Sequence, residues 1–356
     1  MSFFTSSTIT LDAALRDLAS GNVKARHRAA TALGDVEGAT ERRRAAVALT
    51  AALEDDAPMV RAAAAESLGA LGELAPVPAL IARLADGDSA VRQQAAIALG
   101  ALRDPAGFPP LAEALREGPA DLRFQAATSL AEIDAVAAYE PLVAALADRD
   151  AKVAAAAAVA LGTLGDGRAV RHLAPLLEHA DDDVRFEAAW ALAELDDARG
   201  GEVLRAQLRS EPPSPRPLGR VIEAVEALAR LGSPEEREAL SALLASRAAQ
   251  PEAAIVAARH VLALLGEGAR DDVDDLRERQ AAELVLLTAL SARKEHLRGL
   301  AVEQLALVGG AWAEEPLRAL ARSRRGRALA EPIEDALAAI ARRLGAEAPG
   351  GPDVDR

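Results

Sequence analysis

One pattern recurs every 31 residues through the middle of this chain and limits its possible folds more than any other feature. Leucine, valine and alanine return at this spacing in six columns that cover about 160 residues. Two of the columns are Leu49, Leu80, Leu111, Leu142, Leu173 and Leu204, and Leu68, Leu99, Leu130, Leu161 and Leu192. A fixed period of this length indicates a repeat protein, in which each unit packs mainly on its neighbours.

Each unit is expected to contain two helices, A and B. Helix A carries a leucine pair four residues apart, such as Leu80 and Leu84. Helix B carries apolar residues at offsets 0, 4, 8 and 11 from its first apolar column, which is Val91 in one unit. At about 100° per residue these four offsets fall within about 80°, so they form one buried stripe.

The repeat predicts an all-α fold, a right-handed α-solenoid of about ten helical hairpins over residues 1–345. Regular units are expected over about 40–208 and looser ones over 209–345, followed by a disordered tail at 346–356. Aromatic residues make up only 2% of the chain, so Ala and Leu must fill the core. The Pro-rich segment 209–219 interrupts the repeat and is expected to be a surface loop, a hinge or a docking segment.

The helix B pattern V-R-x-x-A-A-x-A-L-G, at residues 91–100, resembles the HEAT repeat. It is most similar to the short bacterial HEAT-like repeats of the phycobilin-lyase type, and the resemblance extends over roughly residues 11–344. In HEAT proteins an Asp between the two helices and an Arg early in helix B form a ladder of charged hydrogen bonds. The matching acidic column is Asp55, Asp86, Glu117 and Asp148, broken by His179, and the basic column is Arg26, Arg61, Arg92, Arg123 and Arg185, broken by Ala154. The alternative is that these are separate, solvated charges.

The common sequence motifs of catalytic, metal-binding and phosphate-binding sites are missing from the sequence. There is no Cys, no H-E-x-x-H pair, no phosphate-binding G-x-x-x-x-G-K-[ST] and no G-x-S-x-G. His172 and His179 are seven residues apart and are expected to be ordinary surface histidines. We therefore expect no enzyme activity, no metal and no cofactor.

The net charge and the hydropathy of the chain limit the classes of partner that it is expected to bind. The formal net charge of −14 disfavours nucleic acid and anionic membranes. No apolar run reaches the roughly 20 residues needed to span a bilayer, and the first residues do not read as a secretory signal. A cytoplasmic protein is the expectation.

The outer side of helix B is the candidate binding surface. Offsets 2 and 6 lie at about 200° and 240°, opposite the buried stripe. In HEAT solenoids the B helices line the concave surface, so the resemblance implies that this side meets a partner. The predicted partner-binding residues are Ile97, Phe124, Val159, Phe186 and Trp190. The alternative is that tight curvature buries the aromatic side chains between neighbouring B helices.

These observations favour a scaffold or adaptor that binds another protein. A bilin lyase subunit or related chaperone-like protein is the first rival, and it rests on the resemblance alone. A nucleic-acid-binding HEAT-like protein is the second rival, and the net charge weighs against it. The basic cluster Arg322–Arg327 is expected to be a solvated surface, or else a contact for an acidic partner.

Overall fold

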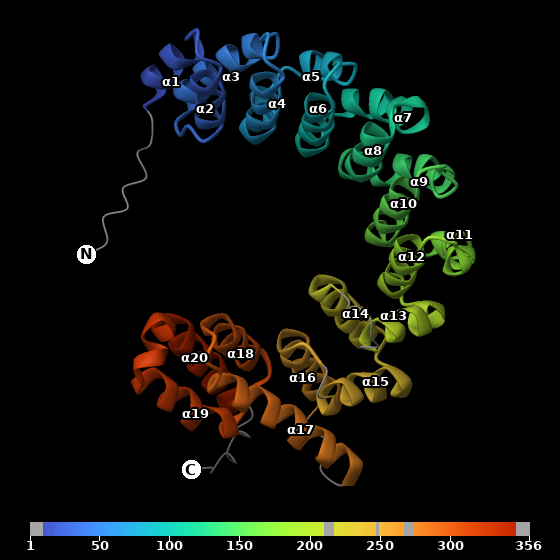
Figure 1. Cartoon of the computed structure of the whole chain (residues 1–356), viewed down its shortest axis with the longest axis vertical. Coiled ribbons are helices and arrows are strands. Elements are labelled where there is room, and N and C mark those ends of the chain that lie inside the picture. Colours follow the sequence, from blue (N-terminus) through green and yellow to red (C-terminus); the bar gives the residue numbers. More distant parts are fainter. Residues whose placement is uncertain (1–9, 210–216, 247–248, 267–272, 347–356) are drawn as a thin grey trace, which may run out of the picture. The chain divides into compact units, whose positions relative to one another are not determined.

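A computed structural model describes residues 10–209, 217–246, 249–266 and 273–346, which form twenty α-helices and no β-strand (Figure 1). Successive helices pair into ten hairpins, from α1 and α2 to α19 and α20. The predicted all-α solenoid of about ten helical hairpins is therefore confirmed. Residues 210–216 of the Pro-rich segment and residues 347–356 of the predicted tail lie outside the described residues.

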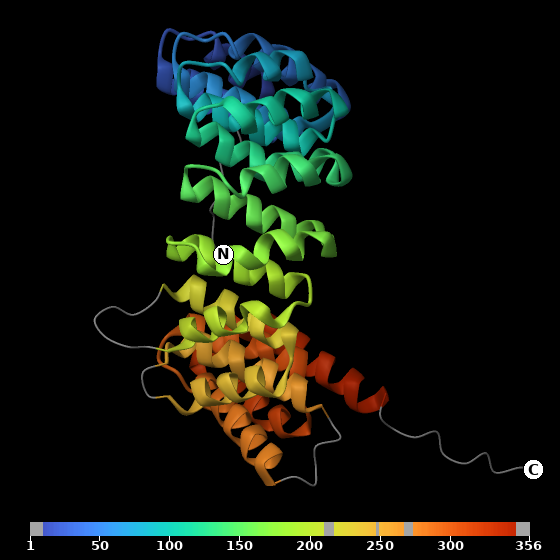
Figure 2. The same ribbon diagram turned by 90° about the vertical axis from the view of Figure 1, so that its right-hand side faces the viewer.

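The chain divides into two compact units, with the boundary inside α12, after Ala191. Figure 2 shows the hairpins of the N-terminal unit as stacked tiers of two helices. Its A helices are α1 (Leu11–Leu18), α3 (Ala39–Ala52), α5 (Val77–Arg83), α7 (Phe108–Glu117), α9 (Ala135–Ala145) and α11 (Val170–Leu173). Its B helices are α2 (Val23–Gly34), α4 (Pro58–Leu71), α6 (Ser89–Leu102), α8 (Ala120–Ile133), α10 (Ala151–Leu164) and α12 (Asp182–Glu194).

The C-terminal unit repeats the same pairing of helices. Its A helices are α13 (Gly201–Leu208), α15 (Pro234–Ala245), α17 (Val273–Leu290) and α19 (Ala311–Arg322). Its B helices are α14 (Leu218–Leu231), α16 (Pro251–Leu265), α18 (Glu295–Val308) and α20 (Ala330–Ala346). None of the described helices is long and apolar enough to cross a membrane.

Local sequence sets the ends of the helices. Asp88 caps α6, because its carboxylate accepts hydrogen bonds from the backbone N–H groups of Ala90 and Val91 at 2.9 and 3.4 Å. Gly72 and Gly165 follow α4 and α10 with φ of 66° and 70°, which side chains other than glycine rarely adopt.

The core of each hairpin is the predicted apolar stripe. Val91, Leu99, Leu130 and Leu161 are fully buried, as are the helix A leucines Leu49, Leu80, Leu111, Leu142 and Leu173. Alanine fills most of the remaining space, so the layers are thin. The register predicted from the 31-residue columns is therefore correct for both helices of the regular units.

Candidate partner-binding face

Successive B helices of the N-terminal unit approach one another closely at four contacts, where glycine at offset 9 of one helix faces a small residue at offset 7 of the next. A Cβ placed on Gly162 would lie 2.7 Å from the Cα of Ala191, which is too close for any side chain. Ser67 fits at one of these contacts and donates a hydrogen bond to the carbonyl of Ala30 at 2.9 Å. The facing pairs are Gly34 and Ser67, Gly69 and Ala98, Gly100 and Ser129, and Gly162 and Ala191.

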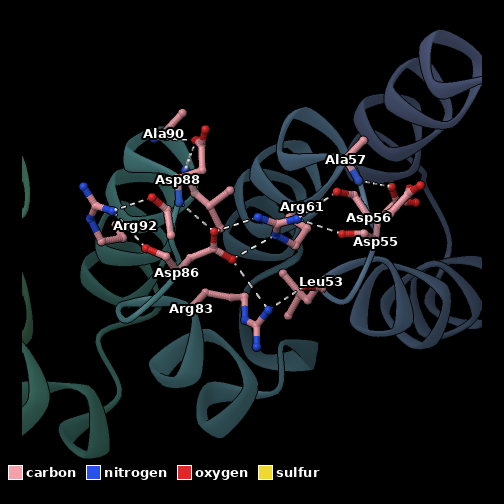
Figure 3. Close-up of polar contacts among 12 residues, drawn as sticks. Leu53, Asp55, Asp56, Ala57, Arg61, Arg83, Asp86, Asp88, Ala90 and Arg92 are labelled. Carbon is pink, nitrogen blue, oxygen red and sulfur yellow. Dashed lines mark hydrogen bonds and ion pairs between the residues drawn. The ribbon is translucent and has the colours of Figure 1, made fainter.

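The predicted charged ladder exists, and Arg61 shows how one rung is built (Figure 3). Its Nε and Nη2 donate to the two carboxylate oxygens of Asp86, in the next hairpin, at 2.8 and 2.7 Å. Its Nη1 donates to the backbone carbonyl of Asp55, in its own hairpin, at 2.8 Å. One guanidinium therefore joins two successive hairpins with directional bonds.

The same rung recurs along the N-terminal unit. Arg26 binds Asp55 through two hydrogen bonds, and Arg123 binds Asp148 in the same way at 2.8 and 2.7 Å. The side chains of Arg123 and Asp148 are only 4% and 11% exposed, so this rung is the most buried of the three bidentate ones. The alternative of separate, solvated charges is therefore wrong for these pairs.

One predicted acidic member is not in the ladder. Arg92 binds Asp121 at 2.8 Å, whereas Glu117 is exposed and pairs with Arg116. The reason is local: α7 extends as far as Glu117, so this residue lies on the helix rather than in the turn where the other ladder acids lie. Asp121, in the first turn of α8, takes its place.

The ladder is interrupted where both partners of one rung have changed. Ala154 stands in the Arg column and His179 in the Asp column of the next hairpin. Ala154 instead packs with Ala155 and Val184 in an apolar cluster that Leu176 adjoins. Replacing both partners of an ion pair leaves no unpaired buried charge, so this interruption has little energetic cost.

Arg185, the last predicted member of the Arg column, turns back to its own hairpin. It donates to the backbone carbonyls of His179 and Ala180 at 2.6 and 2.9 Å, and it also pairs with Asp182. His179 accepts a hydrogen bond on Nδ1 from the backbone N–H of Asp181. His172 lies instead against the ring of Tyr139. Within the described part of the chain, no cluster of three or more side chains could hold a metal ion.

Acid should weaken the ladder, because its carboxylates bind protons less readily in the folded protein. The hydrogen bond from Arg61 is the main cause that lowers the pKa of Asp86. Burial alone would raise the pKa of Asp148, but hydrogen bonds from Arg123 and from the backbone N–H of Asp150 outweigh burial and lower it.

A carboxyl group whose pKa is lower in the folded than in the unfolded protein stabilises the fold at any pH above its unfolded pKa, about 3.9. This stabilisation is lost as the pH falls through the pKa of the folded protein. We therefore expect wild type to be more stable than Asp148→Asn at neutral pH, by an amount that shrinks below about pH 5. Thermal melts of both proteins across this range test the prediction. A difference that does not change with pH would contradict it.

The five residues predicted to bind a partner differ in their exposure to solvent. Ile97 on α6 and Phe124 on α8 are 41% and 40% exposed, while Val159 and Trp190 are half-buried. Phe186 is only 1% exposed, so its predicted exposure is wrong. Equal free space beside every B helix would leave Phe186 exposed, but α12 packs against α10, whose residues 154–158 are all alanine. We attribute the burial of Phe186 to the room that these small side chains leave.

One exposed apolar residue on the B helices of the N-terminal unit was missed. Met59, in the first turn of α4, is 47% exposed. Its offset of −1 corresponds to about 260°, close to the angles of offsets 2 and 6, so the periodicity could have identified it.

Three adjacent B helices present an uncharged surface. We define the B-helix face as offsets 2 and 6 of α6, α8 and α10, which are Gln93, Ile97, Phe124, Thr128, Val159 and the buried Ala155. None of these residues is charged, although charged residues make up 27% of the chain. The arginines at offset 1 of α6 and α8 are held by ladder carboxylates. Depletion of charge around exposed apolar side chains is typical of the centre of a protein interface.

Comparison with known proteins identifies the family of the repeats. The family model for HEAT repeats matches residues 11–86, 47–131, 77–159 and 139–216, together more than half of the chain. Comparison with curated proteins finds no match.

Importin beta is among the solved structures that are similar to the chain, and it is 14% identical with a TM-score of 0.55, over 93% of this chain and 52% of its own. An engineered protein is 22% identical with a TM-score of 0.45, over 93% and 98%. The CpcE and CpcF complex of phycocyanin lyase from Nostoc sp. PCC7120 is 24% identical with a TM-score of 0.39, over 79% and 98%. At 14% identity the likeness to importin beta concerns the fold alone. The other two structures have TM-scores below 0.5, which is too low to support a conclusion about this chain.

Proposed function

The chain belongs to the HEAT-repeat family, and from this premise we propose that it is a non-enzymatic scaffold that binds another protein on the B-helix face. The observation that carries the proposal is the uncharged surface of α6, α8 and α10, on which Ile97 and Phe124 are exposed. A partner segment that presents apolar side chains, such as an amphipathic helix, matches this surface.

The contacts between successive B helices support a role in binding a protein partner. The glycine contacts and the ladder hold successive B helices in one register, so the exposed side chains have fixed positions before a partner arrives. A surface that is already ordered loses little conformational entropy on binding. Aromatic side chains at the centre of an interface commonly contribute about 2 kcal/mol or more to binding.

The test compares two double variants of the N-terminal unit, one on its B helices and a control on its A helices. Ile97→Asp with Phe124→Asp places two charges in the B-helix face. We expect it to abolish capture of a partner that wild type retains in stoichiometric amount from the native cell, because an unpaired carboxylate in an interface centre is strongly unfavourable.

The matched control is Val47→Asp with Val136→Asp, since these apolar residues are exposed on the A helices α3 and α9. Capture should survive in the control, and both variants should keep the helical circular dichroism of wild type. Loss of capture in both variants, or in neither, would show that the B-helix face is not the binding surface.

A further inference from the structure

Two basic turns lie side by side in the C-terminal unit. One joins α17 to α18 and the other joins α19 to α20, and hydrogen bonds connect them: Arg298 donates to the carbonyl of Arg325 at 3.3 Å, and Arg325 donates to the carbonyl of Ser291 at 3.5 Å. Neither turn, residues 291–294 or residues 323–329, contains an acid. We define the basic edge as Arg293, Lys294, Arg298, Arg322, Arg324, Arg325 and Arg327.

The backbone of the second turn is fixed by internal hydrogen bonds. Ser323 donates from its hydroxyl to the carbonyl of Leu320 at 2.7 Å and accepts from the N–H of Gly326 at 3.1 Å. A Cβ on Gly326 would collide with the carbonyl oxygen of Leu320, so this turn requires glycine. Arg324 and Arg327 therefore project from an ordered 3₁₀ turn, Arg324–Leu329.

The basic edge occupies the place of a ladder rung but has no rung acid. Arg298 stands at offset 1 of α18 and donates to the carbonyls of Ala292 and Arg293 in its own hairpin, as Arg61 does in α4. In the next hairpin it meets a backbone carbonyl, that of Arg325, instead of an aspartate. A carbonyl accepts the hydrogen bond without supplying a negative charge.

The result is an excess of positive charge at one place on a protein whose net charge is −14. Arg322 pairs with Glu315 at 3.5 Å, and Arg298 is 3.9 Å from Glu295. Among the described residues, Arg324 and Arg327 have no carboxylate within ion-pair distance, and both are exposed. Guanidinium groups of this kind bind carboxylates through paired hydrogen bonds.

We propose that the basic edge binds a short acidic segment of a protein. This surface lies in the C-terminal unit and differs in chemistry from the B-helix face, so it goes beyond the proposed function and can fail independently of it. A nucleic acid fits less well, because its phosphates continue past the patch and α20 carries exposed Glu331, Glu334 and Asp335 close behind the turn. A short run of Asp or Glu avoids this repulsion.

The test measures binding of a fluorescent oligoglutamate peptide to the full chain at low ionic strength, with an oligoglutamine peptide of equal length as the neutral comparison. Wild type should bind only the acidic peptide, and the affinity should fall as salt is added. Arg324→Gln with Arg327→Gln should weaken binding about tenfold, since two exposed charge pairs are lost.

The matched control is Arg28→Gln with Arg43→Gln, which removes the same charge from exposed positions on α2 and α3. Its affinity for the peptide should stay within about twofold of wild type, because neither arginine belongs to the basic edge and an exposed charge outside a direct pair contributes little. Equal weakening in both variants would overturn the proposal by showing a non-local charge effect. Single-stranded DNA that binds more tightly than the peptide, and depends on the same two arginines, would overturn it in favour of nucleic acid.

Discussion

Replacing Arg123 by alanine is expected to lower the free energy of unfolding by about 2–4 kcal/mol, which is more than any exposed ion pair contributes. The substitution removes both hydrogen bonds to Asp148 and the bond to the carbonyl of Gly118 at 2.9 Å. It also leaves the carboxylate of Asp148 with little access to water and without its cation. Urea denaturation followed by circular dichroism measures the loss.

The double variant Arg123→Ala with Asp148→Ala separates pairing from packing. It imitates the natural interruption at Ala154 and His179, so it should be more stable than the sum of the two single losses implies. Arg116→Ala removes an ion pair in which both side chains are well exposed, and it should not change stability measurably. Strictly additive losses at Arg123 and Asp148 would show that the rung does not act as a unit.

Replacing Phe186 by alanine should lower the free energy of unfolding by about 3–5 kcal/mol, because it empties the space of a buried aromatic ring. Phe124 occupies the same offset on α8 and is 40% exposed, so Phe124→Ala should cost less than about 1 kcal/mol. The pair is a direct comparison of one residue type at equivalent positions. Similar denaturation midpoints for the two variants would contradict the burial assigned to Phe186.

The fold follows from the sequence because its periodicity repeats many times. Leu99, Leu130 and Leu161 belong to one column with 31-residue spacing, and all three are fully buried. The ladder pairs Arg61 with Asp86 and Arg123 with Asp148 could also be anticipated. Both features depend on offsets within a unit, which a repeat preserves.

The errors arose where the outcome depends on a neighbouring unit. The exposure of Phe186 is set by the size of the side chains on α10, which the angles of α12 do not contain. The choice of Asp121 over Glu117 depends on where α7 ends. The basic edge required knowledge that two turns about 30 residues apart are joined by hydrogen bonds of Arg298 and Arg325.

The facing glycine and small residue of successive B helices bear on how such a chain could change in length. A unit such as the one containing α6 carries both halves of the contact: Ala98 meets the helix before it, and Gly100 meets the helix after it. A tandem copy of that unit would therefore present a matching surface to each neighbour and to its own duplicate, without any new substitution. Gene duplication at this point would extend the array by one hairpin while preserving the close approach of the helices on either side.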